Sequence, residues 1–177
     1  MPIPRTWSEE FVCEWLCLKE YSTEVGIGVG TSSKGGRKEA DVVGVRIIEN
    51  EGSRRVLEIY HVEIGQLGSE SENVENLSEK FSKTRTDNIV ARFKKRMSFV
   101  GDVEYHKLYI DIWERQRATK LMNNAKIAAQ KIDVWPISKL YREALTTIRE
   151  QYGPTLPESH WMLKLLYSLY DSDLLKN

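Results

Sequence analysis

Apolar and polar residues alternate most clearly over residues 37–66, RKEADVVGVRIIENEGSRRVLEIYHVEIGQ. Two apolar runs, residues 42–48 and 56–64, flank a polar turn that contains a glycine, which is the pattern of a β-hairpin. In an antiparallel pair, the start of one strand lies beside the end of the other. We therefore expect Asp41 and Glu63 to meet at one rim of a sheet, with apolar neighbours behind them.

The pattern before and after this hairpin predicts helices and further strands. Thr6 or Ser8 is placed to cap a helix that ends near Tyr21 and is apolar on most sides. The segments that follow in the first two thirds of the chain are a strand over residues 22–30, a polar stretch over 68–76, a helix over 76–99 with a break near 84–86, and a strand over 103–113.

The last third of the chain predicts a helix over residues 117–131 and a short strand over 132–135 that Pro136 ends. Ser138 is placed to cap a helix that ends near Tyr152. A final helix is expected over residues 159–169. Its apolar residues are too numerous for a lone surface helix, so it should pack on the domain or on a second copy of the chain.

Length and composition predict one soluble globular domain. The chain has 177 residues, of which 41% are hydrophobic and 29% charged, so it is long enough to bury a core and is not a disordered sequence. No apolar run reaches the roughly 18 residues of a membrane span, and the N-terminus lacks a signal-peptide pattern. Cys13 and Cys17 are expected to be buried thiols, which suits a reducing cytoplasm.

Charge is informative through its distribution, because the 26 basic and 26 acidic residues balance. The Gly-rich loop GTSSKGGRKE leads into the acidic strand. Its glycine amides, with Lys34, Arg37 and Lys38, could hold a phosphate near Asp41, or the loop could be a simple hairpin connection. The later helix carries a basic face that includes Lys80. This face is either a solvated surface or a surface for a nucleic-acid backbone.

The first helix carries two acids, Glu10 and Glu14, on one stripe. One interpretation makes Glu10 a favourable first-turn acid and Glu14 a solvated side chain. In the other, one of the two leans into the same acidic site as Asp41 and Glu63.

The order helix, three strands, helix, strand, with Asp41 on the second strand and Glu63 on the third, resembles the PD-(D/E)XK nuclease superfamily. Within it, the arrangement looks most like archaeal Holliday-junction resolvases and restriction-endonuclease-like proteins. The matching segments are EEF, the Gly-rich basic loop, EADVVGV and YHVEIGQ. The resemblance implies an α/β fold with a restriction-endonuclease-like αβββαβ core, a mixed central sheet flanked by helices, and added C-terminal helices. Residues 1–177 would form one domain, with the nuclease-like core in residues 1–115 and further elements in residues 116–177.

The resemblance implies metal-dependent hydrolysis of DNA phosphodiesters. Asp41, Glu63 and the backbone carbonyl of Ile64 would hold Mg²⁺, with Mn²⁺ as an alternative, and Glu10 matches a first-helix glutamate of the resolvase-like members. His61 shares the face of Glu63 and either reaches the site or is a partly buried strand histidine. Duplex or branched DNA is the implied partner. A homodimer is also compatible, since resolvase-like relatives are commonly dimers.

The sequence departs from the family pattern two residues after Glu63, where the family has lysine and this chain has Gly65. In one interpretation the role of this lysine is taken by Lys38 or Lys80, or in part by His61 or Gln66. Alternatively, catalysis is lost and the chain is an inactive relative that binds nucleic acid or serves in assembly. In a third interpretation the acids are ordinary strand-end charges of an unrelated α/β protein.

Overall fold

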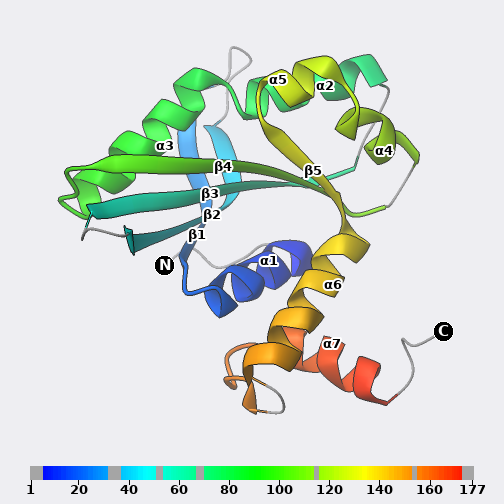
Figure 1. The fold of residues 1–177 in the computed structure, drawn as a ribbon. Helices are drawn as coiled ribbons and strands as arrows, with labels where there is room; N and C mark the ends of the chain where they lie inside the picture. The colour runs from blue at the N-terminus through cyan, green and yellow to red at the C-terminus, as the bar shows by residue number, and fades with distance from the viewer. Residues whose placement is uncertain are drawn as a thin grey trace.

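One five-stranded mixed sheet runs through the computed structural model, which describes residues 6–31, 37–50, 54–66, 70–113, 116–152 and 155–172 (Figure 1). Its strands, in the spatial order β1-β2-β3-β4-β5, are β1 (Ser22–Thr31), β2 (Arg37–Asn50), β3 (Arg54–Gly65), β4 (Asp102–Asp111) and β5 (Ile132–Pro136). The first three strands pair antiparallel, and β3, β4 and β5 pair parallel. The expected α/β class with a mixed sheet, flanking helices and C-terminal helices is confirmed.

Helices cover both faces of the sheet (Figure 1). One face packs against α1 (Trp7–Leu18), α6 (Ile137–Thr147) and α7 (Trp161–Asp171). The other face packs against α2 (Glu70–Lys80), α3 (Lys83–Arg96), α4 (Gln116–Met122) and α5 (Ala125–Ala129). Within the described part of the chain, no helix combines the length and the apolar character needed to cross a membrane.

Helix α1 begins and packs as its sequence predicts. The Thr6 hydroxyl accepts a hydrogen bond from the Glu9 amide at 3.2 Å, which satisfies one of the free N–H groups of the first turn. The helix comes very close to β2, because a Cβ at Gly44 would lie 3.0 Å from Leu16 Cδ1. The glycine therefore lets the apolar side of α1 reach the sheet.

Glu14 has a structural role that the sequence did not reveal. Its carboxylate is only 5% exposed and accepts hydrogen bonds from the first amides of α7, Met162 N at 3.1 Å and Leu163 N at 2.8 Å. The prediction of a solvated Glu14 was wrong, because the N-terminus of α7 packs over it and supplies both backbone donors and a favourable helix dipole. The final helix thus packs on the domain, with Leu163 and Leu166 buried.

Two helix assignments in the middle and last thirds were wrong in detail. The break expected near residues 84–86 falls between α2 and α3, at residues 81–82, because these two helices pack on different parts of the sheet. The single helix expected over 117–131 is divided into α4 and α5. The Asn124 side chain accepts from the Lys126 amide at 3.0 Å, which starts a new helix instead of continuing the old one.

Two smaller predictions also differ from the structure. Pro136, not Ser138, precedes the first residue of α6, because β5 continues directly into the helix and the ring already fixes the backbone angle (φ −68°). The helix then ends in a π-helical turn, η1 (Ile148–Tyr152). Of the two cysteines, Cys13 is half-buried and Cys17 exposed, so the expectation of two buried thiols was wrong for Cys17; both are free.

Replacing Glu14 by alanine should destabilise the protein by about 2–3 kcal/mol, because two buried amides of α7 lose their acceptor. Urea unfolding measured by far-UV circular dichroism tests this. Glu158→Ala is the matched control, since it removes the same charge from an exposed position just before α7. Equal stability of the two variants would contradict a structural role for Glu14.

Candidate active site

Strand register brings Asp41 and Glu63 together. Val42 of β2 pairs with Val62 of β3, so Asp41, one residue earlier, lies beside Glu63, one residue later. Both side chains lie on the face covered by α2, because side chains alternate along a strand. Asp41 Oδ2 accepts a hydrogen bond from the Ile64 amide at 2.8 Å, which fixes this carboxylate against the end of β3.

The ammonium group of Lys80 bridges the two carboxylates. It makes an ion pair with Glu63 Oε2 and lies 3.8 Å from Asp41 Oδ2. Lys80 is the last residue of α2, so this helix brings a positive charge to the acidic rim formed by the strands. Lys80 is one of the two lysines considered for the position left vacant by Gly65, and the structure brings its ammonium to the acids.

The other oxygen of Glu63 is held by a chain of buried side chains. His61 Nε2 lies 2.9 Å from Glu63 Oε1, and the Tyr105 hydroxyl lies 3.0 Å from His61 Nδ1. Because Glu63 accepts, the imidazole must donate from Nε2, so Tyr105 donates to Nδ1. His61 and Glu63 are both fully buried. His61 therefore belongs to the site as the group that orients Glu63.

The environment moves the pKa values of the two carboxyls in opposite directions. Burial, followed by the charge of Glu63, raises the pKa of Asp41 to about 6, against the influence of Lys80. Burial would also raise the pKa of Glu63, but the hydrogen bond from His61 and the charge of Lys80 hold it below its usual value. Burial lowers the pKa of His61, so the imidazole is neutral near pH 7. The site thus holds a firmly ionised glutamate beside a more basic aspartate.

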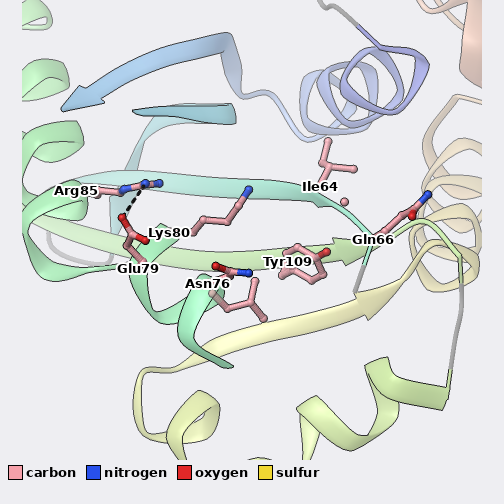
Figure 2. Close-up of a pocket in the computed structure, with 9 residues that line it drawn as sticks. Ile64, Gln66, Asn76, Glu79, Lys80, Arg85 and Tyr109 are labelled. Carbon is pink, nitrogen blue, oxygen red and sulfur yellow. Dashed lines mark ion pairs between the residues drawn. The ribbon is translucent and has the colours of Figure 1, made fainter. Parts of the chain in front are cut away.

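A pocket of about 280 Å³ opens beside the acidic pair, between the ends of β3 and β4 and helix α2 (Figure 2). Figure 2 shows Lys80 extending across it from α2, with the Tyr109 ring below and the amides of Asn76 and Gln66 at its edges. A Cβ at Gly65 would lie 3.1 Å from the Tyr109 hydroxyl. Tyr109 therefore occupies the space into which a side chain at position 65 would extend.

The remaining predicted site residues lie elsewhere or carry no described side chain. Lys34 is outside the described residues, and Arg37 and Lys38 are described only as backbone of β2, where they pair with Thr31 and Gly30. Glu10 lies in the first turn of α1, and its charge acts on Cys13, Glu14 and Cys17. The α1 acid whose charge contributes to the raised Asp41 pKa, after burial and Glu63, is Glu9.

The basic face of α3 is largely engaged within the fold. Arg92 and Arg96 both pair with Glu24 of β1, Lys83 pairs with Asp87, and Lys94 donates to the Gly101 carbonyl. The side chains of Lys83, Arg92 and Arg96 also remain exposed, so the contacts favour the interpretation of this face as a solvated surface.

The donor set of the acidic rim fits a hard divalent cation. Two carboxylates from neighbouring strands already converge on one cation, the Lys80 ammonium. The N–H of Ile64 faces Asp41, and in an extended strand the carbonyl of the same residue points to the same side. Oxygen donors of this kind suit Mg²⁺ or Mn²⁺. Comparison with protein-family models, curated proteins and solved structures found no match to the chain, so this interpretation depends on its own residues.

A second polar group lies on the opposite face of the sheet. Glu58, Glu104 and His106 offer three ligand atoms within 4.8 Å of one another. Glu58 is already paired with Arg46, whose Nε lies 2.6 Å from Oε2, and its other oxygen is 3.1 Å from His106 Nε2. A guanidinium thus neutralises the buried member of this group, as Lys80 neutralises Glu63.

Replacing Asp41 by asparagine should stabilise the metal-free protein at about pH 8. The Asp41 pKa of about 6 lies above its unfolded value, so the folded state binds this proton more tightly. This tighter proton binding stabilises the folded state fully below about pH 4, and the stabilisation is lost as the pH rises through about 6. The neutral amide avoids the loss, which should make the variant more stable by about 1–2 kcal/mol at pH 8 and not at pH 4.

Urea unfolding in EDTA at the two pH values measures this difference. Asp87→Asn is the control, because it makes the same chemical change at an exposed position on α3 and should show no such pH dependence. A less stable Asp41→Asn protein at the higher pH would contradict the raised pKa.

Proposed function

We propose that this protein is a Mg²⁺- or Mn²⁺-dependent nuclease that hydrolyses DNA phosphodiesters at the Asp41–Glu63 pair. The observation that carries the proposal is the convergence of two carboxylates from neighbouring strands on one cation position beside an open pocket. The resemblance of EADVVGV and YHVEIGQ to the PD-(D/E)XK nucleases supports the same chemistry. Free thiols at Cys13 and Cys17 suit action in the reducing cytoplasm.

Each residue of the site has a role in this proposal. Asp41, Glu63 and the Ile64 carbonyl hold the ion, and the Ile64 amide keeps Asp41 in position. A bound Mg²⁺ supplies an activated water and offsets charge on the phosphate. The Tyr105–His61 chain holds Glu63 in one orientation.

Lys80 takes the role of the lysine that the family has at the position of Gly65. An ammonium group beside the metal ligands can orient the attacking water and stabilise negative charge that develops on the phosphate. The last turn of α2 brings this group to the acids, while Tyr109 closes the space beside Gly65. Catalysis through Lys80 is therefore the interpretation that these contacts favour among those left open by the sequence.

An inactive nucleic-acid-binding or assembly module is the second candidate. The observation that favours it is an exposed apolar pair on α7, where Trp161 is 55% and Leu165 is 50% exposed. Residues four apart share one side of a helix, so the pair offers a contact surface for a second copy of the chain.

The nuclease proposal predicts cleavage of single-stranded, duplex or branched DNA with Mg²⁺ or Mn²⁺ and none with EDTA. Asp41→Asn, Glu63→Gln and Lys80→Met should each lower the rate by about 10²-fold or more, since each removes a metal ligand or a charge at the phosphate. Gel analysis of labelled DNA measures the rates. Asp87→Asn and Lys83→Met should cleave like the unchanged protein, because both positions lie on the exposed side of α3.

Two outcomes would reject this assignment. Cleavage that survives both Asp41→Ala and Glu63→Ala would place the chemistry elsewhere. Tight DNA binding without cleavage under all conditions, weakened by removing the charges of Lys34, Arg37 and Lys38, would favour the binding module.

A further inference from the structure

The position of the Lys80 ammonium raises the question of how a divalent ion enters the site. Both carboxylate oxygens of Glu63 have a partner: Oε1 faces His61 and Oε2 faces Lys80. An ion held by both carboxylates needs Oε2 at about 2.0–2.1 Å. The ammonium pairs with that same oxygen and lies 3.8 Å from Asp41 Oδ2, so it stands between the two carboxylates where the ion must lie.

We propose that Lys80 and the divalent ion compete for one position, so that Lys80 serves as the resident counterion of the empty site and withdraws when the ion binds. This inference rests on the metal site of the proposed function, but not on cleavage. It assigns Lys80 two successive positions, one on Glu63 and one in the adjoining pocket.

The balance of charge in the site favours the exchange of the Lys80 ammonium for the divalent ion. In the metal-free site the carboxylates of Asp41 and Glu63 face one ammonium group, that of Lys80. A divalent ion neutralises both carboxylates by itself. An ammonium left in contact would then repel the ion at close range in a site where Glu63 is fully buried and water screens poorly. Lys80 therefore gains nothing by staying on Glu63 once the ion is present.

The pocket provides the second position. Lys80 itself lines the space of about 280 Å³, and its side chain is 34% exposed, so it can turn without disturbing the core. Acceptors for the ammonium line this space: the carboxamides of Asn76 and Gln66, the hydroxyl of Tyr109, and the carboxylate of Glu79. The Glu79 carboxylate lies 3.9 Å from the guanidinium of Arg85, which also lines the pocket (Figure 2). From there the ammonium faces solvent and any phosphate that approaches the ion. The Lys80 ammonium thus moves from the Glu63 carboxylate to the phosphate of a bound ligand.

Metal affinity tests the competition without any nucleic acid. Mn²⁺ binding to the full chain, measured by isothermal titration calorimetry, should be at least about tenfold tighter for Lys80→Met than for the unchanged protein, because a competing and repelling charge is removed. Lys83→Met is the matched control and should bind like the unchanged protein. Lys80→Arg should bind Mn²⁺ with the affinity of the unchanged protein, because arginine keeps the positive charge. Thermal unfolding should show that all three variants are folded.

A second measurement follows the ammonium itself. Amine labelling analysed by mass spectrometry should modify Lys80 several-fold faster when Mn²⁺ is present, while Lys83 is unaffected. Unchanged or weaker metal affinity in Lys80→Met, labelling of Lys80 that does not rise with Mn²⁺, or absence of Mn²⁺ binding to both proteins would each overturn the competition. If the affinity and labelling results hold but no DNA is cut, the exchange stands and the nuclease function fails.

Discussion

An ionised carboxylate buried in the sheet, that of Glu63, is the constraint on which the rest of the site depends. Moving such a charge from water into the protein interior costs several kcal/mol even after the protein relaxes, unless charged or hydrogen-bonding partners offset this cost. Both oxygens of Glu63 have a partner here: the imidazole of His61, supported by Tyr105, on one side and the ammonium of Lys80 on the other. These partners hold the buried charge of Glu63 in one defined position.

Packing of helix α2 sets the direction of Lys80. Leu77 and Phe81 lie three positions before and one position after it, and both are buried against the sheet. The Phe81 ring lies 4.7 Å from the His61 ring. These two anchors lie four positions apart and therefore share the side that packs on the sheet, and Lys80 lies at the edge of that side. The packing that covers His61 thus also places the ammonium near Glu63. The hydrophobic core and the charge compensation therefore use the same turn of helix.

The sequence was enough to predict the hairpin and the meeting of Asp41 and Glu63, because a two-residue period fixes both face and rim once the strands pair antiparallel. The sequence was not enough to predict which side chains contact this pair. Tyr105 and Tyr109 reach the site only through the parallel register of β4 on β3, which no local pattern encodes. The role of Glu14 depends on the distant start of α7, 148 residues away from its partner Met162. These misses involve contacts between elements, whereas the correct predictions concern periodicity within them.

Tyr109 explains why the cation of this site comes from a helix and not from the strand. Its register partner is Glu63, and its hydroxyl fills the space beside Gly65 on the face where the acids lie. An ammonium carried at position 65 would be tied to the same strand as the carboxylate and would move only with it. An ammonium carried by α2 crosses an open pocket to reach Glu63. It can leave while Asp41 and Glu63 stay fixed by the Ile64 amide and by His61, which is what a site that exchanges one cation for another requires.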